Sequence, residues 1–269
     1  MKRGNGMKTI DLRCATAVTL RYLYLLKRDR WLLFEMLYWP SFDIALYGYI
    51  STWISAQNNQ NPTCAVITAV VFWHTMLQAN FAIAKNFLSE LVSGGITNLF
   101  ATTISLREWI AGCALLVIPI ATLVFCFCTI VSYSLFGCPA MATGWATIPI
   151  LACLMINALS LGLASVTFLT YFGLRVQALI FIIGWALALA SGAYYPVGLL
   201  PQMVQTAARI TPLPYLFFVI RNPLMPPPLI VHNIGRAALL TLMWLVIAIV
   251  AFRHTFRRAL KNGLAQLTF

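Results

Sequence analysis

The sequence predicts an all-α integral membrane protein, and three observations support this fold class. Of the 269 residues, 61% are apolar or aromatic and only 9% are charged, whereas about 25% of the residues in a soluble domain are charged. The apolar residues form six long runs, and the basic residues gather on one side of these runs. Because so few charged side chains cannot cover a water-soluble surface, a soluble enzyme is excluded.

Each of the six apolar runs is long enough to cross the roughly 30 Å hydrocarbon core as a helix, which takes about 20 residues. The runs are continuous and lack the alternation of a membrane β-barrel, so helices are expected. The fourth run is longer than one crossing requires and should tilt or project beyond the bilayer. The predicted spans, which together make one membrane domain over 31–254, are 31–54, 63–84, 109–136, 140–173, 176–195 and 237–254.

The positions of the basic residues predict the orientation. With the amino terminus in the cytoplasm, fifteen of the eighteen Lys and Arg residues fall on the cytoplasmic side, and only Arg209, Arg221 and Arg236 fall on the other side. Cytoplasmic loops of membrane proteins carry this excess of positive charge. Both termini are therefore expected in the cytoplasm, and the net charge of +12 needs no nucleic-acid partner.

Residues 1–30 form a basic leader before the first span, and residues 255–269 form a cytoplasmic tail. The stretch from about 9 to 30 contains no Pro or Gly, so a helix is expected there. Its basic residues lie mostly on one arc, which favours an amphipathic helix lying on the inner leaflet. The alternative is a plain basic flank that stops transfer of the first span.

Few ionisable residues lie inside the predicted spans, and these are functional candidates because burying a charge in hydrocarbon costs several kcal/mol. Glu35 lies close enough to the leader to reach the inner surface, whereas Asp43 and His74 lie deeper and could pair. A structural hydrogen bond is the favoured role for His74. No metal site is expected, and the seven cysteines, which show no C-x-x-C pair or framework spacing, are interpreted as small buried apolar residues: Cys14, Cys64, Cys113, Cys126, Cys128, Cys138 and Cys153.

Two segments depart from plain spanning helices. The cytoplasmic connection 85–108 carries Glu90, Glu108 and a Gly94-Gly95 break, and it is long enough for a helix parallel to the membrane that a soluble partner could bind. The alternative is an amphipathic turn without a partner.

The segment 190–228 holds eight of the thirteen prolines but remains apolar. Because proline ends helices and unpaired backbone cannot face lipid, short re-entrant or outer helices are expected there.

Residues 191–215, which read SGAYYPVGLLPQMVQTAARITPLPY, resemble the signature of the type 2 ATP-binding-cassette (ABC-2) exporter permeases. The matching residues are Gly192, Tyr195, Pro196, Pro201, Pro212, Leu213, Tyr215 and Arg221, with Thr211 where Asn is usual. The cytoplasmic connection is similar to the family's loop at Glu90, Gly95, Leu99, Ser105 and Gly112, with Thr103 where Pro is common. Pro40 in the first span also fits, so the resemblance covers essentially the whole chain.

The resemblance implies a permease half in the bacterial inner membrane that dimerises and is powered by a separate ATPase subunit. ATP and Mg would bind that partner, because this chain lacks the G-x-x-x-x-G-K-[ST] phosphate-binding pattern and is expected to have no catalysis or cofactor of its own. A coupling helix is implied over 90–106 and an outer gate after the fifth span. The implied coupling residues are Glu90, Gly94, Gly95, Asn98, Leu99, Arg107 and Glu108, and the implied gate residues are Gly192, Tyr195, Pro196, Pro201, Pro212 and Tyr215.

The expected function is outward transport of an amphiphilic drug, lipid or polysaccharide by alternating access. Two other classes stay open: an ATP-independent secondary carrier or channel, and an integral-membrane enzyme such as a lipid-modifying transferase. The enzyme needs a surface cluster of His, Asp or Glu that the sequence does not offer. The candidate pathway residues are Trp39, Asp43, Tyr47, Phe72, Trp73 and His74; for the aromatic ones the alternative role is an interfacial belt.

Overall fold

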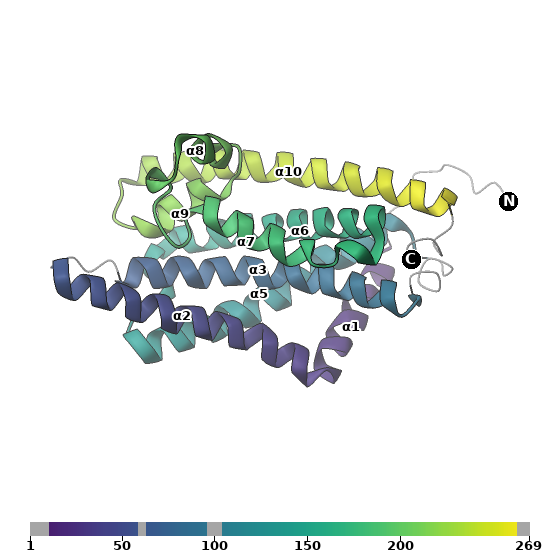
Figure 1. Ribbon diagram of the computed structural model, residues 1–269, viewed down its shortest axis with the longest axis horizontal. Helices are drawn as coiled ribbons and strands as arrows, with labels where there is room; N and C mark the ends of the chain where they lie inside the picture. The colour runs from purple at the N-terminus through teal and green to yellow at the C-terminus, as the bar shows by residue number, and fades with distance from the viewer. Residues whose placement is uncertain (1–10, 59–62, 96–103, 263–269) are drawn as a thin grey trace.

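The computed structural model describes residues 11–58, 63–95 and 104–262. Every regular element in these residues is a helix, which confirms the all-α class. Five long helices lie lengthwise beside one another (Figure 1): α2 (Arg30–Asn58), α3 (Thr63–Val92), α5 (Leu106–Phe136), α6 (Thr147–Phe172) and α10 (Pro227–Asn262). α3 is the central helix, because it contacts α2, α5, α6, α7 and α9 and most of its residues are buried.

The bundle has two distinguishable ends (Figure 1). The amino-terminal helix α1 (Leu12–Arg28) and the last turns of α10 lie at one end, which we call the α1 end. The short helices α8 (Gln202–Arg209) and α9 (Leu213–Arg221) lie at the other, which we call the α8–α9 end.

Within the described part of the chain, four helical segments are long and apolar enough to cross a membrane, or five if α8 and α9 count as one broken span; the four are Thr63–Val92, Leu106–Phe136, Thr143–Val176 and Pro227–Leu260. The prediction of a multi-pass membrane protein is therefore confirmed, whereas the predicted number of six spans is not. The predicted spans 31–54 and 176–195 correspond to α2 and α7 (Leu179–Ser191), which are not among the four. α2 has 29 residues but carries two carboxylates and many Tyr and Trp residues, and α7 has only 13 residues, about 20 Å of helix.

The leader forms a helix, as predicted. Its buried residues, Ala15, Val18, Thr19 and Tyr22, recur at the spacing of one helical face. This face packs against α5 at Gly112, where a side chain would collide with Val18 and with the Ala15 carbonyl. The Thr19 hydroxyl donates to the Gly112 carbonyl at 2.9 Å. α1 ends at Asp29, whose side chain accepts from the first amides of α2 and thereby starts the next helix.

The fourth predicted span is not one long helix. It begins as the 3₁₀ segment η1 (Ala140–Ala146), which contains Gly144 with a φ of +58°, and continues as α6. Before it, Gly137 ends α5 in the left-handed conformation that glycine adopts without strain. The extra length of the run is therefore a folded turn at the α8–α9 end.

The proline-rich segment forms short helices, as predicted. α7 ends at Ser191 because Gly192 adopts a left-handed φ of +79°. Then follow η3 (Val197–Leu199), α8 and α9, and the last two meet at an angle of 99°. Arg221 of α9 donates to the carbonyls of Gly192 and Ala193, both at 2.9 Å, so α9 satisfies the backbone groups left at the end of α7.

The cysteine interpretation was wrong for two residues. Cys64 at the start of α3 and Cys138 after α5 form a disulfide across a sequence separation of 74 residues. The bridge lies at the α8–α9 end and joins the first turn of α3 to the loop that leads into η1. The other five cysteines are free thiols.

Candidate functional site

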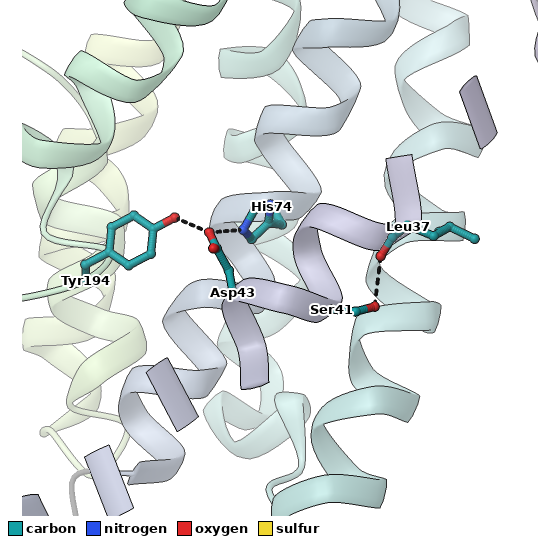
Figure 2. Close-up of polar contacts among 5 residues, drawn as sticks. All are labelled: Leu37, Ser41, Asp43, His74 and Tyr194. Atoms are coloured by element: carbon teal, nitrogen blue, oxygen red, sulfur yellow. Dashed lines mark hydrogen bonds and ion pairs between the residues drawn. The ribbon is translucent and has the colours of Figure 1, made fainter. Parts of the chain in front are cut away.

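Three polar side chains from distant parts of the chain meet between α2, α3 and the turn after α7 (Figure 2). The Nε2 atom of His74 lies 2.8 Å from Oδ2 of Asp43, and the hydroxyl of Tyr194 donates to the same oxygen at 3.0 Å. Asp43 and His74 are buried, with 5% and 1% of their surfaces exposed. The pairing that the sequence left open is therefore present, and Tyr194 is its unpredicted third member.

Two hydrogen bonds hold this cluster together at one oxygen atom. Oδ2 of Asp43 accepts from the Tyr194 hydroxyl and pairs with Nε2 of His74. The other ring nitrogen of His74, Nδ1, is buried without a hydrogen-bond partner among the described residues. Most buried polar atoms in proteins are paired, so Nδ1 is the unsatisfied position of the cluster.

The predicted pathway aromatics separate into two groups. Tyr47 packs on Tyr194 with ring centroids 4.4 Å apart, and Trp39 is 46% exposed on the same helix. Phe72 and Trp73 are completely buried: Phe72 contacts Phe125 of α5, and Trp73 contacts Tyr194 and Phe217. Asp43, Tyr47 and His74 therefore form one site, whereas Phe72 is a core residue on another face of α3.

A cavity of about 200 Å³ lies beside this cluster, between α2, α3 and α7. His74 forms part of its wall, and so do Glu35 of α2 and Lys85 of α3, whose Oε1 and Nζ atoms are 2.8 Å apart. The cavity, which we call the α2–α3–α7 cavity, is lined by Glu35, Trp39, His74, Leu77, Gln78, Phe81, Lys85, Phe181 and Trp185. The cavity wall thus holds the Glu35–Lys85 pair and His74, while Asp43 contacts His74 from outside the lining.

At the α1 end, the predicted coupling residue Glu90 contacts the leader. Its Oε1 lies 2.6 Å from the Nη2 atom of Arg21, and only 4% of the Glu90 side chain is exposed. Gly95 lies against the same carboxylate, and any side chain there would collide with it. Gly94 has a φ of +68°, which suits glycine. An ion pair therefore joins the leader, which packs on α5, to the end of α3.

The remaining predicted coupling residues fall into two groups, those at the start of α5 and those outside the described residues. Glu108 caps α5 together with Ser105 and also accepts from the amide of Asp11. Arg107 is exposed beside it. Asn98 and Leu99 lie outside the described residues, as do eight of the seventeen residues of the predicted coupling helix 90–106.

The predicted gate residues lie at the α8–α9 end, around a cavity of about 780 Å³. Gly192, Pro196 and Tyr215 line it together with Arg209 and Arg221. The Tyr195 hydroxyl donates to the Leu189 carbonyl at 2.8 Å and closes the turn that follows α7. Pro201 and Pro212 precede the first residues of α8 and α9, where the fixed φ of proline favours a helix start.

The sequence did not single out Arg21, Lys85, Trp185 or Tyr194 as site residues. Lys85 had a usable signal, because it lies eleven residues after His74 and therefore on the same face of a continued helix.

In the described part of the chain, no three His, Cys, Asp or Glu side chains gather to hold a metal ion. No protein-family model matches the chain, and no match was found among curated proteins.

Proposed function

We propose that this chain is the permease subunit of an ATP-driven exporter in the bacterial inner membrane. The observation that carries the proposal is the arrangement at the α8–α9 end. A short α7 ends at Gly192, and the bent pair α8–α9 follows before the last long helix. This order of elements suits the signature that residues 191–215 share with the ABC-2 permeases.

Two independent features support the orientation with both termini in the cytoplasm. The basic residues of α1 and of the last turns of α10 lie at the α1 end, and the Cys64–Cys138 disulfide lies at the opposite end. Disulfides persist outside the reducing cytosol. Both features support a cytoplasmic location of the α1 end.

In the proposal α2 and α7 complete a set of six spans. The two carboxylates that lower the apolarity of α2 are paired with α3, Glu35 with Lys85 and Asp43 with His74. Pairing offsets much of the cost of placing a carboxylate among the spans. α7 is preceded by η2 (Gly173–Val176) and followed by the η3 turn, which lengthen its path at both ends.

The proposed mechanism is alternating access by two copies of the chain, surrounded by membrane lipids. Closure of two separate ATPase subunits, which bind ATP and Mg, pushes the segment 90–106 against the bundle. The contact of Glu90 with Arg21 transmits this displacement to α1. The close packing of α1 on Gly112 transmits it further to α5. The chain itself transports an amphiphilic substrate outward without catalysing a reaction.

A second candidate function is an ATP-independent carrier, and the Asp43–His74 pair favours it. A buried carboxylate and imidazole in contact are a suitable proton-accepting site. The exporter would be driven by ATP hydrolysis, whereas the carrier would transport without ATP.

The test is ATP hydrolysis by the complex that a tagged chain isolates in mild detergent. Glu90→Arg and Gly95→Pro are expected to reduce hydrolysis at least tenfold, because they place a like charge beside Arg21 and a ring against Glu90. Arg236→Gln, an exposed change at the α8–α9 end, serves as the control. Unchanged hydrolysis and transport in both coupling variants would contradict the proposal.

A further inference from the structure

The cavity at the α8–α9 end, which we call the α8–α9 cavity, carries positive charge that no carboxylate in its wall balances. The wall is formed by α3, the turn after α7, α8, α9 and α10, and among the described residues it contains Arg209 and Arg221 but no acidic side chain. The six Asp and Glu residues of the whole chain all precede residue 109: Asp11, Asp29, Glu35, Asp43, Glu90 and Glu108. The elements from α6 to α10 therefore carry no carboxylate side chain.

Neither arginine forms an ion pair within the described residues. Asp43 contacts Tyr194 in the turn after α7, but it is also bonded to His74 and does not line the α8–α9 cavity. Arg221 is half-buried, and charges that leave water are stabilised by an opposite charge. An anion from outside the chain would supply that charge.

Arg221 is held in place and still has donors to offer. Its Nε and Nη2 atoms donate to the carbonyls of Gly192 and Ala193, both at 2.9 Å. A guanidinium group has five N–H donors, so three of them make no hydrogen bond within the described residues. Arginine binds phosphate through two parallel hydrogen bonds. Because the two carbonyls already fix the side chain, little conformational freedom is lost when it binds such a group.

The rest of the wall is mostly apolar. Val66 of α3, Val197 of η3 and Phe218 of α9 line the α8–α9 cavity, and 48% of the Phe218 surface is exposed. The amide side chains in the wall each donate to a nearby backbone carbonyl: Gln205, Asn222 and Asn233. The volume of about 780 Å³ falls within the range of about 300–1,000 Å³ that is usual for small-molecule sites. The cavity therefore suits a ligand with an anionic group and an apolar group.

We propose that the α8–α9 cavity binds a phosphorylated amphiphile, with its phosphate on Arg209 and Arg221 and its apolar group against Val197 and Phe218. A phosphate monoester carries a charge of about −1.5 to −2 at pH 7, which balances the two arginines. The predicted gate residues Gly192, Pro196 and Tyr215 line the same cavity. The inference rests on the proposed function in that it names the class of substrate which the exporter would release at this end.

The other cavities provide comparisons for this site. The α2–α3–α7 cavity is smaller, about 200 Å³, and its Lys85 is paired with Glu35. A basic cavity of about 340 Å³ lies at the α1 end and contains Arg107, Arg253 and Arg257. Binding at the α1 end would depend on these arginines and not on Arg209, so substitutions distinguish the two basic cavities.

The first experiment measures binding of three small probes to the purified chain in phosphatidylcholine nanodiscs, with empty nanodiscs as the blank. Isothermal titration calorimetry with benzyl phosphate, inorganic phosphate and benzyl alcohol separates charge from apolar contact. Benzyl phosphate is expected to bind at least tenfold more tightly than either of the others. Equal affinity for inorganic phosphate would remove the apolar contribution, and equal affinity for benzyl alcohol would remove the charge contribution. Either result would overturn the proposal.

The second experiment uses substitutions. Arg209→Gln should weaken benzyl phosphate binding about tenfold, and Arg221→Lys, which keeps the charge but loses the planar fork, should weaken it several-fold. Arg236→Gln, an exposed change at the same end, and Arg257→Gln at the α1 end should leave binding unchanged. Unchanged binding in Arg209→Gln, or an equal loss in Arg257→Gln, would overturn the proposal.

Arg209→Gln keeps the test decisive if Arg221→Lys fails to fold. The Arg221 side chain supports the end of α7, whereas the Arg209 side chain is exposed and makes no hydrogen bond within the described residues. Thermal unfolding of both variants shows which of them is folded. A folded Arg209→Gln variant alone is then sufficient to support or overturn the proposal.

A membrane phospholipid and a transported solute could both supply the phosphate, and native mass spectrometry separates these sources. Retention of phosphatidylglycerol by the chain, lost in Arg209→Gln, would identify a membrane lipid as the ligand. Benzyl phosphate binding without such retention would identify a solute. Both outcomes support the site.

The outcomes also separate this inference from the proposed function. Absence of benzyl phosphate binding in a preparation that retains an ATPase would overturn the phosphate site and leave the exporter proposal intact. Benzyl phosphate binding by a chain that never associates with an ATPase would support the phosphate site and contradict the exporter proposal.

Discussion

Arg21 of α1 and Glu90 near the end of α3 form an ion pair, with 2.6 Å between Nη2 and Oε1. The glutamate is buried and the arginine is about half exposed. The leader is thereby attached to the helix that leads into the predicted coupling segment. This pair is the structural link on which the proposed coupling between ATPase and permease depends.

The ion pair predicts a charge-swap rescue. Arg21→Glu and Glu90→Arg should each place like charges together and lower ATPase retention about tenfold. The double variant Arg21→Glu/Glu90→Arg should recover most of it, because the opposite charges face each other again. The amount of ATPase that co-purifies measures the effect, and a double variant no better than the single ones would show that the pair is not the link.

Close packing at Gly112 predicts that a methyl group there is destabilising. A Cβ atom at Gly112 would lie 2.8 Å from Val18 and 2.9 Å from the Ala15 carbonyl, and overpacking of this kind costs about 1–3 kcal/mol. Gly112→Ala should therefore lower the thermal stability in detergent and expose α1 to proteolysis. Gly235→Ala is the matched control, since nothing lies within 4 Å of that position. Equal stability of the two variants would contradict the packing of α1 on α5.

The polar cluster predicts a graded series. Asp43→Asn removes the carboxylate that both His74 and Tyr194 contact and should cost about 1.5–3 kcal/mol, the usual contribution of a hydrogen bond to a charged group. Tyr194→Phe removes one hydrogen bond and should cost about 1 kcal/mol. Thermal unfolding in detergent measures both, and a larger loss in Tyr194→Phe than in Asp43→Asn would refute this account of the cluster.

The disulfide predicts the pattern of thiol labelling in intact cells. A membrane-impermeant maleimide should label Cys64 and Cys138 only after reduction, because both thiols are bonded and lie at the proposed outer end. Cys14 in α1 is the internal control and should stay unlabelled. Reduction should also cost about 4 kcal/mol of stability for a loop of this length. Labelling of Cys14 from outside would reverse the proposed orientation.

The sequence predicts where apolar helices lie better than where they end. Apolarity marks the part of a helix inside the bilayer, but backbone hydrogen bonding continues beyond it. α3 accordingly runs on through Lys85 to Val92, and α10 begins at Pro227, ten residues before its predicted span. Lys85 was assigned to a loop for this reason, and its place in the cavity wall was missed.

Contacts between distant residues were predictable only where chemistry limited the choice. Asp43 and His74 were natural partners because few other ionisable residues lie deep in the predicted spans. Tyr194 carries no such signal, since tyrosine near the end of a span is typical of the membrane interface. The pairing of Cys64 with Cys138 depends on how α3 and α5 meet in space, which spacing along the chain does not reveal.

The central claim is that two copies of this chain work with a separate ATPase, and native mass spectrometry of the complex isolated in mild detergent tests it most directly. The account predicts a mass that contains two 29.9 kDa chains and two copies of an ATP-binding protein. A stable particle that contains this chain alone, and still transports after reconstitution without ATP, would contradict the exporter and support the carrier.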